Sequence, residues 1–223
     1  MEYDALRNNV VFCFWFGGKM SRQRQSCFQS MKDNLNLCLI REKDLYKYEL
    51  KSSPFHEGFE YLSRTHKSDY LRCYFMNFYG GCYSDIKMYN HNLDLNFEEL
   101  RNSNEQIYGV GYSETRMQDV CLTSKYRHDF KNHIGNGCFI FKKNTFFTNL
   151  WLNKVNESLD SFLPNLKKYP GANFDRLVLG EKKGYDYPLK WADMQGNIFH
   201  PLVYMYRDSF LKNLEPPSFT NYR

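Results

Sequence analysis

The sequence lacks the cysteine pattern of a disulfide framework. Its 223 residues include seven cysteines, an odd number, and no two of them form a Cys-x-x-Cys pair. Several lie inside apolar runs, where a reduced cysteine behaves as a small hydrophobic residue. This distribution favours a protein that stays reduced and argues against a fold held together by disulfide bonds.

Long apolar runs and secretion signals are also absent from the sequence. Residues 1–9 are polar and mixed in charge, which does not fit the start of a signal peptide. No apolar run approaches the roughly 20 residues that a helix needs to cross a bilayer. We therefore expect a soluble, cytoplasmic protein with no integral membrane segment, unless the chain is one domain of a longer protein.

Charge of one sign is present only in mild excess. The formal net charge is +5, from 30 Lys and Arg against 25 Asp and Glu. The basic residues are scattered, and neither an RNP-like nor a helix-turn-helix pattern occurs. The excess suits a phosphate-bearing ligand, and we expect no nucleic-acid partner. Steeply salt-dependent binding to oligonucleotides would overturn that expectation.

What the sequence does contain is an alternation of strand and helix patterns, in a chain long enough for one sizeable core. Apolar runs bounded by turn residues predict strands over residues 10–16, 35–40, 82–88, 106–111 and 137–142. Helical spacing predicts helices over 21–34, over 57–78 with a break near 63–67, and over 145–158. No repeat or linker interrupts this order. We therefore predict one α/β domain over residues 1–223, with a mostly parallel central sheet and helices on both faces.

The stretch YGGCYSDIK, residues 79–87, carries a carboxylate and an ammonium at the end of a predicted strand. Side chains alternate along a strand, so Asp85 and Lys87 are expected on one face and Ser84 on the other. Ligands of open α/β sheets bind beyond the carboxyl ends of the strands. The three residues therefore form a candidate polar site. A surface ion pair on an edge strand is the alternative interpretation.

Two shorter motifs precede this stretch. In FWFGG, Trp15 follows Phe14 at the end of the first predicted strand. An indole at this position can stack on a nucleobase. The alternative interpretation is a tryptophan of the hydrophobic core. Gly17 has no Cβ, so its backbone N–H can approach a ligand closely. In SDYLR, Asp69 and Arg72 are one helical turn apart, and a solvated ion pair on the helix surface is the alternative there.

Taken in this order, the three motifs resemble the sugar-nucleotide core of GT-A glycosyltransferases over residues 12–88. The resemblance is to the DXD sugar-binding group, which includes capsular polysaccharide glycosyltransferases, yeast outer-chain mannosyltransferases and the glucosylating clostridial toxins. Small glycosyltransferase domains of chlorella viruses are similar as well, and a viral chain of this kind would act in the host cytoplasm. The resemblance implies a single GT-A-type domain that transfers a sugar to a glycan acceptor with retention of configuration.

The resemblance also implies roles for individual residues. Trp15 would stack on the base of a nucleoside-diphosphate sugar, with UDP favoured and GDP still open. Asp69 and Arg72 would bind the hydroxyls and diphosphate of this donor. Asp85 would bind ribose, metal and phosphate, and it is also a candidate catalytic residue.

The carboxyl-terminal half offers weaker matches. Asn136, in NGCFIF, resembles a position that faces the donor sugar, and a turn-forming Asn-Gly is the alternative. His200, in GNIFHP, is a candidate further metal ligand, although a lone histidine is more often structural. Asp175 and Asp193 are candidate catalytic carboxylates beside the reacting carbon, and the sequence does not choose between them.

The sequence departs from the DXD pattern at Lys87, which stands where a second carboxylate belongs. One interpretation is that Mn²⁺ or Mg²⁺ still binds, weakly, through Asp85, the diphosphate and His200. The other is that Lys87 contacts the diphosphate in place of the metal. The departure also leaves open a non-catalytic nucleotide-sugar binding domain that derives from a glycosyltransferase.

Overall fold

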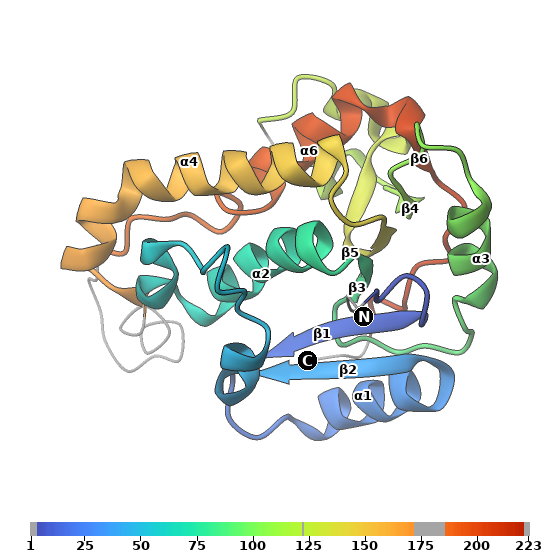
Figure 1. The fold of residues 1–223 in the computed structure, drawn as a ribbon, viewed down its shortest axis with the longest axis horizontal. Helices are drawn as coiled ribbons and strands as arrows, with labels where there is room; N and C mark the ends of the chain where they lie inside the picture. The colour runs from blue at the N-terminus through green and yellow to red at the C-terminus, as the bar shows by residue number, and fades with distance from the viewer. Residues whose placement is uncertain (1–3, 122, 172–185, 221–223) are drawn as a thin grey trace.

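A six-stranded mixed sheet runs through the computed structural model, which describes residues 4–121, 123–171 and 186–220 (Figure 1). Its strands lie in the order β2-β1-β3-β5-β4-β6. Only β5 runs against the other five strands, which confirms a mostly parallel sheet. The bounds are β1 Val10–Trp15, β2 Asn36–Arg41, β3 Gly81–Ser84, β4 Gly109–Ser113, β5 Ile134–Phe141 and β6 Phe210–Leu211.

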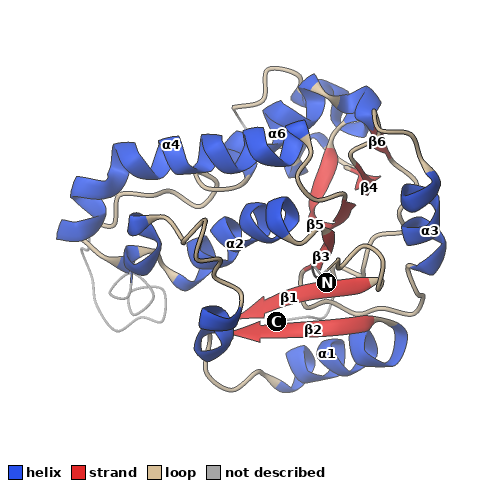
Figure 2. Cartoon of the chain, in the orientation of Figure 1, coloured by secondary structure: helices blue, strands red, loops and turns tan. Residues whose placement is uncertain are grey.

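Five α-helices surround the sheet in the described part of the chain (Figure 2). They are α1 Arg22–Asn34, α2 Arg64–Phe78, α3 Asp94–Asn102, α4 Phe146–Lys168 and α6 Gly196–Met205. Short 3₁₀ helices include η1 Glu42–Lys47 and η2 Glu57–Tyr61. No helix in the described ranges is both long enough and apolar enough to cross a membrane.

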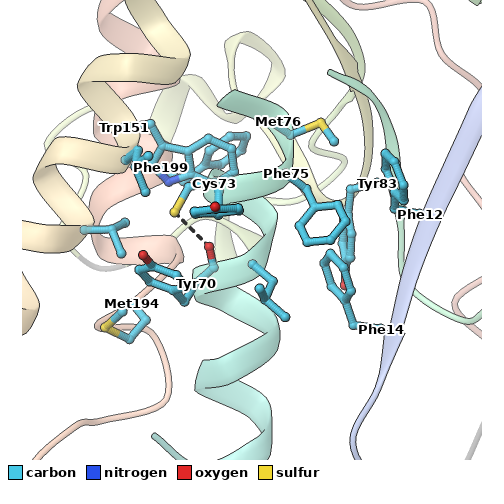
Figure 3. Close-up of a cluster of buried hydrophobic side chains, with 14 of the residues drawn as sticks. Phe12, Phe14, Tyr70, Cys73, Phe75, Met76, Tyr83, Trp151, Met194 and Phe199 are labelled. Atoms are coloured by element: carbon cyan, nitrogen blue, oxygen red, sulfur yellow. Dashed lines mark hydrogen bonds between the residues drawn. The ribbon is translucent and has the colours of Figure 1, made fainter. Parts of the chain in front are cut away.

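Both faces of the sheet carry apolar side chains, and helices pack against each face. On β1, Phe12 and Phe14 point toward α2 and pack edge-on against Phe75, with ring centroids 4.9 Å and 5.1 Å apart (Figure 3). Their neighbours Val11 and Cys13 join the opposite cluster, which includes α1 and α3. This alternation follows from the two-residue period of a strand. The described residues thus form one α/β domain with helices on both faces, as predicted.

Several predicted boundaries agree with the structure. Ser21 caps α1, its hydroxyl accepting a hydrogen bond from the Arg24 backbone N–H at 3.1 Å. The predicted break in the second helical region, residues 57–78, lies between η2 and α2, and Ser63 caps α2. Caps of this kind satisfy backbone N–H groups that have no partner inside the helix.

Other boundaries were wrong. The third strand ends at Ser84 and does not continue to Met88. The backbone N–H of Asp85 still donates to the carbonyl of Gly137, but the chain then bends at Ile86, and Met88 forms an isolated bridge with Ser218. Asp85 and Lys87 therefore do not share a strand face. Helix α4 extends to Lys168 and β5 begins at Ile134, both outside the predicted ranges. Helices α3 and α6 were not predicted at all.

The double glycine before β3 has a structural role, because it allows a backbone conformation that other residues rarely adopt. Gly80 and Gly81 have φ of 64° and 79°, in the left-handed region that other residues rarely adopt. A Cβ on Gly81 would lie 2.8 Å from the Cβ of Ala5. The pair therefore lets the chain leave α2 and enter β3 in a crowded space. It lies at the amino end of β3, at the far end of the strand from Asp85.

Candidate functional site

The candidate site lies at the edge of the sheet where the parallel strands end. Trp15 is the last residue of β1, and Asp85 follows β3 directly. Strand β5 runs in the opposite direction, so its first residues, among them Asn136, meet the end of β3. Glu114 follows β4, and its backbone N–H donates to the carbonyl of His133. The topology thus gathers polar residues from four strands at one edge.

Arg72 connects the predicted residues at this edge. Its Nη2 lies 3.4 Å from Asp69 Oδ1 and 3.3 Å from Asp85 Oδ1. Its Nη1 donates to the backbone carbonyl of Asn136 at 3.2 Å. The planar guanidinium suits this role, because it presents several donors in a fixed fork. The structure therefore brings Asp69, Arg72, Asp85 and Asn136 together, and their functions stay predictions.

Tyr83 contacts both Arg72 and Asp85. The sequence analysis did not identify this residue. Its hydroxyl donates to Asp85 Oδ1 at 2.7 Å, and its ring lies 4.5 Å from Arg72 Cζ. Phe14 stacks on the same ring, with centroids 5.4 Å apart. Phe14 is thus a buried support for Tyr83. Strand alternation puts Tyr83 two residues before Asp85, which is the signal that could have found it.

Burial sets the electrostatics of the group. Asp69 is only 4% exposed, and burial raises the pKa of its carboxyl, with the charge of Arg72 opposing that rise. Burial alone would lower the pKa of Arg72, but Tyr83, Asp69 and Asp85 raise it overall. The guanidinium therefore stays charged, and its positive charge is fixed at the edge of the sheet.

Asn136 is positioned by a second residue that the sequence analysis missed. Gln195, the residue before α6, donates from Nε2 to Asn136 Oδ1 at 3.1 Å. The Asn136 carbonyl is already bonded to Arg72. Helix α6 and β5 are thus joined at the site. Nothing in the local pattern of the sequence indicated this pairing, since α6 was not predicted.

A cavity of about 370 Å³ opens beside Trp15. The indole is half-buried, and its Nε1 donates to the Gly18 carbonyl at 2.7 Å. A Cβ on Gly17 would lie 3.1 Å from Trp15 Cζ2, so the glycine lets the chain fold closely over the ring. The ends of β1 and β2 meet here, Trp15 pairing with Arg41. The cavity is lined by Trp15, Phe16, Gly17, Arg41, Glu42 and Lys43.

Ser84 and Lys87 are both buried. The Ser84 hydroxyl donates to the carbonyl of Asp85 at 2.9 Å and lies 2.8 Å from the hydroxyl of Tyr89. Lys87 is 4% exposed, and its Nζ lies 5.4 Å from the centre of the Phe219 ring. Ser84 thus stabilises the loop that carries Asp85. Lys87 packs against Phe219 in the carboxyl-terminal segment.

His200 is enclosed by protein groups. Its Nδ1 accepts the backbone N–H of Cys121 at 3.0 Å, and its Nε2 lies 3.6 Å from Glu114 Oε1. Burial by itself lowers the pKa of the imidazole, but Cys121 and Glu114 raise it overall. Both ring nitrogens therefore face protein groups in this structure. Cation binding by His200 stays a prediction.

Of the two remaining predicted carboxylates, the structure describes Asp193. Asp193 accepts hydrogen bonds from the Lys190 backbone N–H at 2.7 Å and from Asn197 Nδ2 at 2.9 Å. It also lines a cavity of about 410 Å³ beside α4 and α6. These contacts make Asp193 a turn residue before α6. Asp175 lies outside the described residues.

Asp85 keeps one carboxylate oxygen that is not engaged by the described residues. Its side chain is 31% exposed, and its Oδ2 accepts no hydrogen bond from the described residues. Within the described ranges, no group of three or more His, Cys, Asp and Glu side chains is arranged to hold a metal ion. One carboxylate oxygen is compatible with Mg²⁺ or Mn²⁺, which take further ligands from substrate phosphates.

Comparisons with known proteins give a structural likeness but no sequence match. No protein-family model matches the sequence, and no curated protein matches it significantly. Among solved structures, the chain is similar to a protein titled "PaToxG Glycosyltransferase". The two are 15% identical, the match covers 93% of this chain and 88% of that one, and the TM-score is 0.45.

Proposed function

We propose that this chain is a GT-A-type glycosyltransferase that moves a sugar from a UDP-sugar to a hydroxyl of a glycan. One observation carries the proposal: Arg72 joins Asp69, Asp85 and the Asn136 carbonyl at the strand ends, and a cavity opens at the end of the neighbouring strand β1. A fixed guanidinium between carboxylates suits a ligand that combines diphosphate with sugar hydroxyls. The mildly basic chain fits an anionic donor.

The base of the donor would occupy the cavity beside Trp15. The indole offers a stacking surface, and such stacking contributes about 1–3 kcal/mol per base. Arg41 and Lys43 line the same cavity and place positive charge near the ribose and phosphates. Gly17 leaves room for the ligand because no side chain rises from it.

The diphosphate and sugar would extend from this cavity toward Asp85. The sugar hydroxyls would bond to Asp69 and Asn136, whose positions Arg72 fixes. As the glycosidic bond breaks, negative charge grows on the departing UDP. Arg72 holds a positive charge beside Asp85, and Lys87 follows Asp85 by two residues, so both would stabilise the charge that forms on the leaving group.

A divalent cation, Mn²⁺ or Mg²⁺, would bind between Asp85 and the diphosphate. The open Oδ2 of Asp85 suits this role, and such a cation neutralises charge on the leaving group. Lys87 stands two residues further along the chain and brings a second positive charge. A bound cation and Lys87 would each neutralise charge on the leaving group. An assay in EDTA distinguishes these two roles, because EDTA removes only the cation.

A second candidate function is binding of a nucleotide sugar without transfer. The observation that favours it is Lys87, which stands in place of a second carboxylate and is buried against Phe219. A binding-only protein would retain donor affinity but release no nucleoside diphosphate. Asp193 and the undescribed Asp175 remain predicted catalytic carboxylates of the transfer reaction.

Thermal unfolding in the presence of nucleotide sugars tests the proposal. A ligand that binds only the folded state raises the apparent melting temperature. We expect an increase with at least one UDP-sugar, greater with Mn²⁺ present, and a smaller increase in Arg72→Lys. GDP-sugars serve as the comparison panel. An unchanged melting temperature with every UDP- and GDP-sugar would contradict the proposal.

A further inference from the structure

Gln195 leaves an amide oxygen unused beside the candidate site. The residue is only 4% exposed, and its Nε2 donates to Asn136 Oδ1 at 3.1 Å. Its Oε1 is buried and accepts no hydrogen bond within the described part of the chain. A buried polar atom without a partner is costly, so each such atom needs a physical reason. The unused oxygen therefore points to a donor that the described residues do not supply.

A second unpartnered atom belongs to the same group. Arg72 Nε is buried and bonds to no described residue, although the terminal nitrogens of this guanidinium contact Asp85 and the Asn136 carbonyl. Gln195 contacts the Asn136 side chain from the other direction along the chain, ahead of α6. Both residues that bond to Asn136 thus retain unused hydrogen-bonding capacity. The group is open to solvent at Asp85, whose side chain is 31% exposed, and at the half-buried Asn136.

The turn before α6 fixes the position of Gln195. Its backbone N–H donates to the Ala192 carbonyl at 3.3 Å. In the same turn, Asp193 accepts a hydrogen bond from the Lys190 backbone N–H at 2.7 Å. His66 Nε2 lies 3.2 Å from the Lys190 carbonyl and so connects this turn to α2. The amide of Gln195 is therefore carried by a backbone that is already held in place, which a specific binding site requires.

The chemistry of the two unpartnered atoms indicates a hydroxyl group. Gln195 Oε1 can only accept a hydrogen bond, and Arg72 Nε can only donate one. A hydroxyl both donates and accepts, so it satisfies either atom. The conclusion also holds if the N and O positions of the Gln195 amide are exchanged, because a hydroxyl accepts from an amide N–H. An apolar group would leave both atoms unpaired.

We propose that Gln195 binds a hydroxyl of the transferred sugar and thereby selects a hexose in which this hydroxyl is free. The inference rests on the proposed function, which brings the sugar to Asp69 and Asn136. The sugar hydroxyl donates to Gln195 Oε1 and replaces the missing partner. A site built to bond a substrate hydroxyl rejects the analogue that lacks it, because its buried polar groups are then left unpaired. Sugars that lack this hydroxyl should therefore bind more weakly.

A binding cycle that combines a protein change with a ligand change tests the contact. Calorimetry gives the Kd of UDP, of UDP-glucose and UDP-galactose, and of the monodeoxy analogues of both sugars. Each ligand is titrated into the parent protein and into Gln195→Met, which retains a long side chain and removes the amide. We expect the variant to bind the preferred hexose donor about 2- to 12-fold more weakly, which corresponds to one neutral hydrogen bond. The Kd of UDP, which has no sugar to transfer, should stay the same.

The deoxy analogues show whether the lost contact is the proposed one. With the parent protein, one analogue should show a similar loss of affinity. With Gln195→Met, that analogue should show no further loss, because both changes remove the same hydrogen bond. Losses that multiply for every analogue would overturn the proposal, since Gln195 and the hydroxyls would then act independently. An equal loss of affinity for UDP would also overturn it, because the role of Gln195 would then be structural.

A control variant and the UDP titration complete the test. Asn156→Leu is the matched control, because Asn156 also carries a buried amide oxygen without a partner, on α4, and every Kd should stay at the parent value. Gln195→Ala carries the same predictions and is used if Gln195→Met does not fold. A parent protein that binds neither UDP nor any UDP-sugar would contradict the proposed function itself. A parent protein that binds both, with no coupling at Gln195, would overturn this inference alone.

Discussion

Replacement of Arg72 by methionine tests the electrostatic arrangement of the candidate site. The substitution keeps an unbranched side chain of similar length and removes the guanidinium. Asp69, which is 4% exposed, then loses the cation 3.4 Å from its carboxylate. Asp85 and the Asn136 carbonyl lose a donor as well. A buried charge without its partner is far more costly than the same charge in water.

The expected magnitude follows from that burial. Removal of one partner of a buried ion pair costs about 3–5 kcal/mol of unfolding free energy. With an m-value of roughly 2 kcal/mol per molar urea, the unfolding midpoint falls by about 1.5–2.5 M. Arg116→Met is the matched control, because Arg116 pairs with Asp119 at 2.8 Å on the surface. Its cost should stay within about 1 kcal/mol.

The pH dependence gives a second test of the same substitution. Burial raises the folded-state pKa of Asp69 above its unfolded value, so the folded state binds more protons between those two pKa values. Unfolding free energy therefore falls as pH rises through that window. Loss of Arg72 raises the folded pKa further and widens the window. The cost of Arg72→Met should thus be smallest at acid pH and grow toward neutral pH. Equal costs for Arg72→Met and Arg116→Met, at every pH, would refute this reasoning.

Two further predictions concern the ligand. Trp15→Ala should weaken binding of a UDP-sugar by about 1–3 kcal/mol, roughly 5–150-fold in Kd by calorimetry, because base stacking is lost. The exposed Trp191→Ala is its control and should leave Kd unchanged. Transfer should stop in EDTA and return with Mn²⁺, whereas full activity in EDTA would assign the role of the cation to Lys87.

Much of the fold followed from local patterns of the sequence. The first strand and the helix after it were predicted almost to the residue, because an unbroken apolar run and a Ser21 cap mark them clearly. Helix α6 was missed because Pro201 lies inside it and its residues are apolar on most sides. Strand β3 was predicted too long because the chain bends after Asp85 and Met88 pairs with Ser218, a long-range contact that no local pattern encodes.

The candidate site was predictable only where short motifs carried it. The motifs SDYLR and YSD identified Asp69, Arg72 and Asp85. The structure joins these three residues through ion pairs to Arg72. Gln195 and Glu114 were not found, because they reach the site through long-range packing of α6 and β4. Glu114 directly follows β4, which ends at Ser113. The predicted strand ended at residue 111, so Glu114 was not recognised as a residue at the end of a strand.

Release of UDP from a UDP-sugar is the most direct test of the central claim. The donor identified by thermal unfolding is incubated with Mn²⁺ and the protein, with and without a glycan acceptor, and free UDP is measured. The account predicts that UDP accumulates with the parent protein and that Asp85→Asn, which retains the shape of the side chain, abolishes its release although the variant is still folded in the absence of urea. Donor binding with no UDP release would contradict transfer and support the binding-only function. Unchanged release by Asp85→Asn would remove Asp85 from the site.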